Sequence, residues 1–440
     1  MSRSTAPIAI IGAGSVGLAA AAHLLARGAT PLVFEAGPQV GSAIQQWGHV
    51  RLFSPWRYLV DAAAAEMLHA AGWRDPSPDE LPTGQELVKR YLQPLAALPG
   101  MSPYLRLSSR VVAIARQGYD KMKTAGREEA PFVLTIQEAN GATSQMLASA
   151  VIDASGTYAT PNPLGANGLP ALGEQRLGQR IRYGIPDVLG AERARYAGKR
   201  VLVVGSGHSA FNALLDLAQL AQQEPGTRII WAVRRSSLDQ LFGGGANDAL
   251  PARGQLGQRL QAIIEAETVE IHTGVQIEQA RMTKQGVIVS GGDTSLAPVD
   301  RIIAATGFRP DLTLTRELRL ELDPAVESPR ALAPLIDPNL HSCGTVPPHG
   351  YEELKHPERD YYIVGMKSYG RAPTFLMLTG YEQARSIACA LTGDLEGARQ
   401  VQLTLPETGV CSTDLSSGGC CEPAAPAILK HAGKPLPVLG

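Results

Sequence analysis

The chain has no excess of charge of one sign, few aromatic residues and no apolar run long enough to cross a lipid bilayer. Its 440 residues carry 40 Lys and Arg against 41 Asp and Glu, which gives a net charge of −1, and only 5% of them are aromatic. Because no apolar run is long enough, we expect no membrane-spanning helix. Because the chain has neither a basic tail nor a basic patch with interleaved aromatic residues, we expect no nucleic-acid partner. Residues 1–5 also lack the apolar region of a signal peptide, so we expect a cytoplasmic protein.

Cysteine is scarce, and its spacing excludes one common redox arrangement. The five cysteines are Cys343, Cys389, Cys411, Cys420 and Cys421. None of them belongs to a C-x-x-C pair, so the redox-active dithiol that disulfide reductases carry in this form is absent. Cys389 lies in the apolar stretch 384–391, which predicts a place in the core.

A glycine-rich turn follows the first apolar run. Residues 8–11 lead into Gly12-Ala13-Gly14-Ser15-Val16-Gly17, and an Ala- and Leu-rich stretch and a second apolar run over 31–34 come next. This order predicts a strand, a tight turn, a helix and a strand, with a pyrophosphate at the helix N-terminus and ribose hydroxyls on the acid that closes the unit. The predicted contacts of this first dinucleotide are Gly12, Gly14, Ser15, Gly17 and Glu35.

A second turn of the same kind lies almost two hundred residues later. Gly205-Ser206-Gly207-His208-Ser209-Ala210 follows an expected strand over 200–204, and an expected helix over 211–220 and strand over 228–233 end at Arg234-Arg235. Since a guanidinium binds a 2′-phosphate that a carboxylate would repel, the arginines predict NADPH at this turn. Two dinucleotides on one chain are usually a flavin and a nicotinamide, so we expect FAD at the first turn. The predicted NADPH contacts are Gly205, Ser206, Gly207, His208, Ser209, Arg234 and Arg235.

The order of these units predicts an α/β fold with two Rossmann-like dinucleotide-binding domains, the NADPH domain being inserted in the FAD domain. We expect the first part of the FAD domain over 1–162, with a helical excursion over 46–105. The NADPH domain is expected over 163–310, the return of the FAD domain over 311–405, and a flexible Cys-containing tail over 406–440. Residues 110–114 and 132–136 predict a small antiparallel ribbon, and the charged segment 120–130 between them is expected to be exposed.

The motifs resemble those of the FAD- and NADPH-dependent class B flavoprotein monooxygenases. Residues 205–210 are similar to the NADPH motif of that class, and Ala305-Thr306-Gly307-Phe308-Arg309-Pro310 is similar to the ATG-type motif that joins its two domains. The chain departs from the class at 183–187, where Tyr-Gly-Ile-Pro-Asp lacks a His, and this argues against amine-oxygenating or Baeyer–Villiger chemistry. The resemblance implies further contacts of Thr306 and Gly307 with NADPH and of Trp47, Val112, Gly365 and Met366 with FAD.

A closer resemblance lies in the last hundred residues. Residues 366–375, MKSYGRAPTF, and 405–411, LPETGVC, resemble the flavoprotein monooxygenases encoded in arsenic-resistance operons. The resemblance implies that NADPH and O₂ are used to oxidise arsenite, methylarsenite or antimonite to the pentavalent form through a flavin peroxide. Such an enzyme serves the detoxification of arsenic and antimony.

Three of the cysteines suit such a substrate. Soft thiolates bind soft ions, so Cys411, Cys420 and Cys421 are the predicted ligands of the metalloid, and Cys343 joins them if the tail folds back over the site. The alternative is a tail whose cysteines have no such role.

The oxidation demands no acid or base side chain, and the candidates for a catalytic role are His49, Arg51 and Tyr58, in the segment expected to cover the flavin. The favoured alternative for each of them is a structural or cofactor-contacting role. Three other functions stay open: a monooxygenase of an amine or sulfur nucleophile, a metal or disulfide reductase that uses the adjacent Cys420 and Cys421, and a metalloid-binding or redox-sensing flavoprotein without turnover. The sequence makes no prediction of the oligomeric state.

Overall fold

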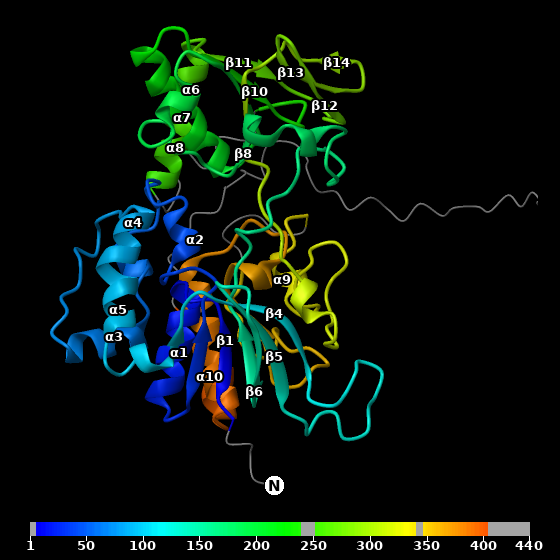
Figure 1. Ribbon diagram of the computed structural model, residues 1–440. Coiled ribbons are helices and arrows are strands. Elements are labelled where there is room, and N and C mark those ends of the chain that lie inside the picture. Colours follow the sequence, from blue (N-terminus) through cyan, green and yellow to red (C-terminus); the bar gives the residue numbers. More distant parts are fainter. Residues whose placement is uncertain (1–5, 239–250, 340–345, 404–440) are drawn as a thin grey trace, which may run out of the picture.

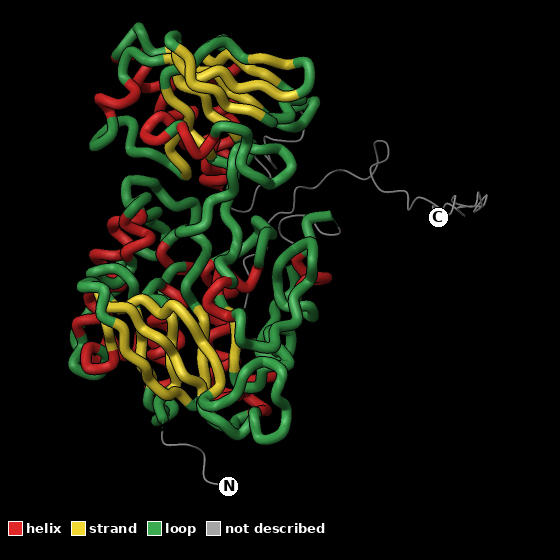
Figure 2. The backbone as a smooth tube through the Cα atoms, turned by 45° about the vertical axis from the view of Figure 1, so that its right-hand side comes forward, coloured by secondary structure: helices red, strands yellow, loops and turns green. Residues whose placement is uncertain are grey.

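The chain folds into two lobes, each built on a five-stranded parallel sheet. The computed structural model describes residues 6–238, 251–339 and 346–403. The first lobe lies at the bottom of Figure 1 and the second lobe at the top, and Figure 2 shows loop segments running between them. The first lobe contains the beginning and the end of the described chain, and the second lobe contains its middle.

The sheet of the first lobe has the strand order β16-β7-β1-β2-β3, with all neighbours parallel. Its central strand, β1, has alternate residues on opposite faces, as a pleated strand requires. Ile8 and Ile10 pack with helices α1 and α10, while Ala9 and Ile11 pack with the antiparallel sheet β4-β5-β6. Both faces of the parallel sheet are therefore covered, which explains why β1 is apolar throughout. The elements of this lobe are β1 (Ile8–Ile11), α1 (Ser15–Ala26), β2 (Pro31–Phe34), α2 (Ser42–Gln45), α3 (Ala62–Ala70), α4 (Gly84–Leu87), α5 (Gln93–Ala97), β3 (Leu105–Arg106), β4 (Ser109–Arg116), β5 (Phe132–Glu138), β6 (Thr143–Ala148), β7 (Ala150–Asp153), α9 (Ala333–Ile336), β16 (Tyr361–Ile363), α10 (Met377–Leu391) and α11 (Leu395–Arg399).

The second lobe repeats this architecture. Its parallel sheet has the order β11-β10-β9-β15-β8, and β9 divides its side chains in the same way. Val201 and Val203 pack with helix α7, while Leu202 and Val204 pack with the antiparallel sheet β12-β13-β14. The elements are β8 (Ile181–Tyr183), α6 (Arg193–Tyr196), β9 (Arg200–Val204), α7 (His208–Gln223), β10 (Arg228–Ala232), α8 (Pro251–Glu265), β11 (Val269–His272), β12 (Gln279–Thr283), β13 (Gly286–Gly291), β14 (Thr294–Ser295) and β15 (Arg301–Ala304).

The two Rossmann-like sheets confirm the predicted fold class. The strand β16, which follows the whole second lobe in sequence, pairs in parallel with β7 of the first lobe. The chain therefore leaves the first sheet after β7 and returns to complete it. The expected helical excursion contains the short helices α3, α4 and α5, which lie beside the first sheet in Figure 1.

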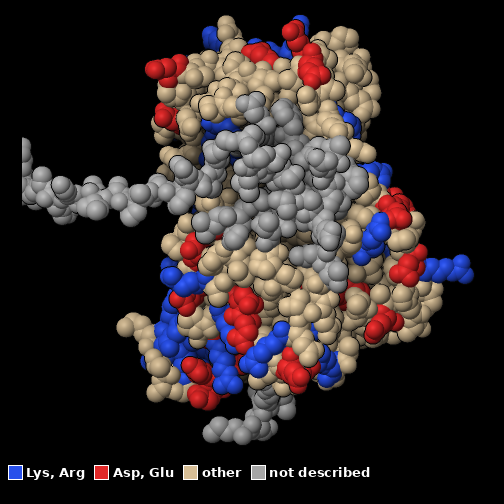
Figure 3. All heavy atoms as spheres, turned by 180° about the vertical axis from the view of Figure 1, so that it is seen from behind, with Lys and Arg blue, Asp and Glu red and all other residues tan. Residues whose placement is uncertain are grey.

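One residue departs from the prediction that the segment 120–130 is exposed. Most of the segment is exposed, but Arg127 is buried together with Arg116 and Glu358. The guanidinium of Arg127 donates to both carboxylate oxygens of Glu358 at 2.7 and 2.8 Å, and Arg116 Nε donates to Oε1 at 2.8 Å. A buried carboxylate needs such partners, and the partner in this case lies 231 positions away in sequence. Elsewhere on the surface, basic and acidic side chains lie next to one another over the lower lobe (Figure 3).

The buried His356 gives the fold a dependence on pH. The backbone N–H of Glu321 donates to its Nδ1 at 3.4 Å, and burial lowers the pKa of His356 from 6.5 to about 4. Between these two values the unfolded chain binds more protons than the folded chain. The contribution of neutral His356 to the free energy of unfolding is therefore complete above about pH 6.5 and is lost as the pH falls towards 4.

We expect His356→Phe to remove this contribution. Urea unfolding at pH 7 and pH 5 should show that the wild type loses about 1–2 kcal/mol more than the variant between the two values. His69→Gln, at an exposed surface pair, is the control and should retain the wild-type slope. Equal slopes for the wild type and His356→Phe would contradict the assignment.

Candidate functional site

The first glycine turn lies between β1 and α1 and presses against the end of β7. Gly12 has a φ of +99°, and a Cβ at this position would lie 2.7 Å from the carbonyl oxygen of Ala154. A Cβ at Gly17 would lie 1.9 Å from the carbonyl oxygen of Gly12, so helix and strand approach as closely as the backbone allows. A Cβ at Gly14, in contrast, would meet no other residue within 4 Å. The turn is therefore closed on its protein side and open at Gly14, which is the form that a pyrophosphate at a helix N-terminus requires.

The carboxylate of Glu35 lies beside this turn. It follows directly after β2, and its two oxygens accept hydrogen bonds from the backbone N–H groups of Ala13 at 2.9 Å and of Gly37 at 2.8 Å. The carboxyl ends of parallel strands are where nucleotides bind in such sheets. The structure thus places the predicted ribose-binding acid at the turn itself.

The second glycine turn, between β9 and α7, has the same construction. Gly205 has a φ of +131°, and a Cβ there would lie 2.2 Å from the carbonyl oxygen of Ala305, at the end of β15. A Cβ at Gly207 would meet no other residue within 4 Å. The buried Ala210 takes the third glycine position. Each turn therefore offers open backbone at its middle glycine, and the residues present fit a dinucleotide at both.

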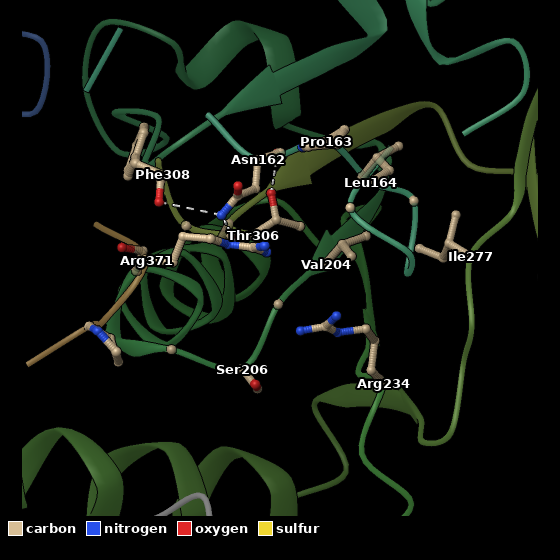
Figure 4. A pocket seen from close by; sticks show the side chains of 18 of the residues that line it. Asn162, Pro163, Leu164, Val204, Ser206, Arg234, Ile277, Thr306, Phe308 and Arg371 are labelled. Atoms are coloured by element: carbon tan, nitrogen blue, oxygen red, sulfur yellow. Dashed lines mark hydrogen bonds between the residues drawn. The ribbon is translucent and has the colours of Figure 1, made fainter. Parts of the chain in front are cut away.

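A pocket of about 440 Å³ opens at the second turn and is lined by both lobes (Figure 4). The glycine turn and the end of β10 line it from the second lobe, and the segment after β16 lines it from the first lobe. Among the described residues that line it, two are arginines and none is acidic, which favours an anionic ligand. Its lining includes Asn162, Val204, Gly205, Ser206, Gly207, His208, Ser209, Arg234, Thr306, Gly307, Phe308, Met366, Arg371, Ala372 and Pro373.

The two chain segments that connect the lobes run side by side at this pocket. Asn162 N–H donates to the carbonyl of Gly307 at 2.9 Å, and the hydroxyl of Thr306 donates to the carbonyl of Asn162 at 2.6 Å. Pro161 and Phe308 form an antiparallel bridge. Sequence reasoning singled out Thr306 and Gly307 but missed Asn162, which faces them from the other connection.

All but one of the predicted NADPH contacts line this pocket. His208 begins α7, and its ring lies 5.5 Å from the ring of Phe53, which belongs to the first lobe. Arg234 lies at the end of β10 and donates from Nη1 to the carbonyl of Ala166 at 3.1 Å. Arg235 is exposed and is not among the lining residues.

The remaining predicted FAD contacts lie at different places in the first lobe. Ser15 is buried at the start of α1, and the ring of Trp47 packs against Gly84. Val112, which is 38% exposed, lies at the irregularity in the pairing of β4 with β5. Gly365 directs its N–H to the side chain of Gln383, and Met366 lines the pocket described above.

The three candidate catalytic side chains are not among the lining residues of this pocket. Arg51 is exposed and donates to the carbonyl of Leu81, and Tyr58 ends a short 3₁₀ turn. His49 is half-buried, and its Nε2 has no hydrogen-bond partner within the part of the chain that the structure describes. The geometry therefore assigns no reaction step to these residues.

The predicted metalloid ligands Cys343, Cys411, Cys420 and Cys421 lie outside the described residues. Cys389 is buried in α10, as its apolar surroundings predicted. Over residues 6–238, 251–339 and 346–403 there is no cluster of three His, Cys, Asp or Glu side chains that could hold a metal ion. No described helix is both long and apolar enough to span a membrane.

The chain is similar to several oxidoreductases. A ferredoxin–NADP reductase of Salinispora tropica is 27% identical over 319 residues, which cover 72% of this chain and 78% of that protein. Among solved structures, the bacillithiol disulfide reductase of Bacillus cereus matches with a TM-score of 0.64 at 18% identity, covering 88% of this chain and 98% of that one. The FAD-bound cadaverine monooxygenase DfoA of Erwinia amylovora matches with a TM-score of 0.61 at 13% identity, covering 92% and 99%.

The two structural matches share the fold but belong to enzymes with different reactions, a disulfide reductase and a monooxygenase. The family match is broader than either. Residues 9–330, which include both glycine turns and both connections between the lobes, match the family described as pyridine nucleotide-disulphide oxidoreductase. The chain belongs to this family and is an FAD-dependent NAD(P)H oxidoreductase.

Proposed function

We propose that the protein is an NADPH- and O₂-dependent monooxygenase that oxidises a trivalent arsenical or antimonial to the pentavalent form, in the detoxification of these elements. The observation that carries the proposal is the place of residues 366–375, the segment that resembles the flavoproteins of arsenic-resistance operons. Met366, Arg371, Ala372 and Pro373 of this segment line the pocket at the second glycine turn. We propose that the nicotinamide and the flavin meet beside this segment.

The proposed reaction balances with the two nucleotides and O₂ alone. NADPH and a proton supply two electrons, the trivalent centre gives up its lone pair, one oxygen atom joins that centre and the other leaves as water. Bound FAD supplies the redox and oxygen-activating chemistry, while the chain binds and orients the reactants. Cys411, Cys420 and Cys421, together with Cys343, remain the proposed thiolate ligands of the metalloid.

We propose that Arg234 selects NADPH over NADH. It is the one arginine of the predicted pair that lines the pocket, and its guanidinium can hold a 2′-phosphate by charge-assisted hydrogen bonds. Arg234→Gln should weaken NADPH binding by about 10- to 100-fold and leave NADH binding within about twofold. Titration of the FAD-loaded protein with both nucleotides checks this, with Arg235→Gln as the neighbouring control.

A second function is favoured by the relatives. Three curated relatives, each 25–27% identical to this chain, are named ferredoxin–NADP reductase. An enzyme of that kind exchanges electrons between NADP(H) and an iron–sulfur protein, and it needs no C-x-x-C pair. We therefore carry transfer to a one-electron acceptor as the alternative function.

One set of assays separates the two functions. The FAD-loaded protein is mixed with NADPH in air, with arsenite, methylarsenite, antimonite, cadaverine or no addition, and NADPH and O₂ consumption are followed. The same protein is then tested anaerobically with ferredoxin. Stimulation by a trivalent metalloid in air supports the proposal. Rapid anaerobic reduction of ferredoxin, without any stimulation by a metalloid, supports the alternative.

A further inference from the structure

The pocket at the second turn contains two guanidinium groups, and they come from different lobes. Arg234 belongs to the second lobe and lies on one side of the glycine turn. Arg371 belongs to the first lobe and lies on the other side, with its side chain directed towards Thr306 (Figure 4). In this view the backbone that joins Val204 to Ser206 passes between the two arginines.

The backbone that carries Arg371 is held in one conformation. Gly370 has a φ of +59°, and a Cβ there would lie 2.0 Å from the carbonyl oxygen of Val326. Arg371 N–H donates to this same carbonyl at 2.7 Å, and Ala372 N–H donates to the carbonyl of Tyr369 at 2.9 Å. The start of the side chain is therefore fixed at the edge of the pocket.

The guanidinium of Arg371 has no protein partner within the ranges that the structure describes, where it forms neither an ion pair nor a side-chain hydrogen bond. The contrast with nearby Arg309 is direct, since that arginine pairs with Glu327. A free guanidinium in a pocket without acidic lining residues is suited to bind an anion, and its planar fork matches phosphate oxygens.

The direction of a bound dinucleotide follows from the other contacts. If the 2′-phosphate lies at Arg234 and the pyrophosphate at Gly205 and Gly207, the nicotinamide half extends away from Arg234, towards Thr306 and Arg371. This is also the direction of Met366, next to the predicted flavin site. We propose that Arg371 binds the nicotinamide-side phosphate of NADPH from the opposite lobe, so that one nucleotide is held by both lobes.

The inference rests on the part of the proposed function that places NADPH at this turn, and not on the metalloid. Two ligands test it, because 2′,5′-ADP carries the 2′-phosphate and the adenosine-side phosphate but lacks the nicotinamide half. Both NADP⁺ and 2′,5′-ADP are titrated calorimetrically into the FAD-loaded full chain, without metalloid. The variants are Arg371→Ala, Arg371→Lys, Arg234→Ala and, as a control for surface charge, Arg359→Ala, whose side chain is 66% exposed.

Arg371→Ala should weaken NADP⁺ binding by about 10- to 100-fold and leave 2′,5′-ADP binding within about twofold. Arg371→Lys should bind NADP⁺ more tightly than Arg371→Ala, because it restores the charge. Arg234→Ala should weaken both ligands, and Arg359→Ala should weaken neither. Unchanged NADP⁺ binding by Arg371→Ala would overturn the inference, and so would an equal loss for both ligands.

FAD absorbance and thermal unfolding of each variant show that the protein is folded. No titration contains a metalloid. The binding result for Arg371 therefore holds even if no metalloid stimulates NADPH and O₂ consumption. A wild-type protein that binds neither ligand would overturn both the inference and the assignment of NADPH to the turn.

Discussion

Replacement of Lys367 by methionine is expected to lower the free energy of unfolding by about 3–5 kcal/mol. The Nζ of Lys367 donates to Asp153 Oδ2 at 2.7 Å and to the hydroxyl of Ser155 at 3.0 Å, and the side chains of both Lys367 and Asp153 are 0% exposed. Tyr361 also donates to this carboxylate, at 3.1 Å. The variant leaves a buried carboxylate without its counter-charge at the end of β7, directly before Ala154, whose carbonyl supports the first glycine turn.

Urea unfolding followed by far-UV circular dichroism measures this loss. The matched control is Lys355→Met, which removes the exposed pair of Lys355 with Glu352 and should cost less than about 1 kcal/mol. The double variant Lys367→Met with Asp153→Asn should be more stable than Lys367→Met alone, because the uncompensated charge is removed. Equal losses for Lys367→Met and the exposed control would show that the buried pair does not hold this end of the sheet.

Replacement of Gly207 by alanine should weaken NADP⁺ binding by at least about tenfold while the protein keeps its FAD and its thermal stability. The backbone at Gly207 has a φ of −97° and a ψ of 177°, which any residue adopts, and an added Cβ meets no other residue within 4 Å. The fold therefore tolerates the methyl group. The methyl group occupies the open space through which the pyrophosphate would approach the backbone.

Gly226→Ala is the control for this experiment, since its Cβ would make only an ordinary contact at 3.4 Å, away from the pocket. Calorimetric titration with NADP⁺, flavin absorbance and the melting temperature together separate loss of the nucleotide from loss of the fold. If Gly207→Ala retains wild-type affinity, the second turn does not bind the pyrophosphate.

The regular parts of the fold could be predicted from local sequence. Runs such as 8–11 and 201–204 are apolar because both faces of each sheet are covered. Each run ends at a glycine where a Cβ would collide with a carbonyl oxygen at the end of a neighbouring strand. The glycine pattern thus records a backbone contact that no other residue allows. For this reason the two turns and the order of the units were predicted from sequence alone.

The parts that escaped prediction depend on contacts between distant residues. Strand β6 (Thr143–Ala148) is mostly exposed and has little apolar alternation, so it gave no signal. The sequence around Arg127 is charged and predicts an exposed residue, whereas its pairing with the distant Glu358 places it in the interior. Arg371 belongs to a segment noticed only by resemblance, and its position in the pocket follows from the way in which β16 returns to the first sheet.

The measurement that tests the central claim most directly is the stoichiometry of the reaction. NADPH oxidised, O₂ consumed and pentavalent product formed are counted together, with catalase present so that released hydrogen peroxide cannot oxidise the metalloid in solution. The proposed monooxygenase predicts one NADPH and one O₂ for each pentavalent arsenic or antimony, with or without catalase. NADPH oxidation without pentavalent product, or product that disappears when catalase is added, would contradict it.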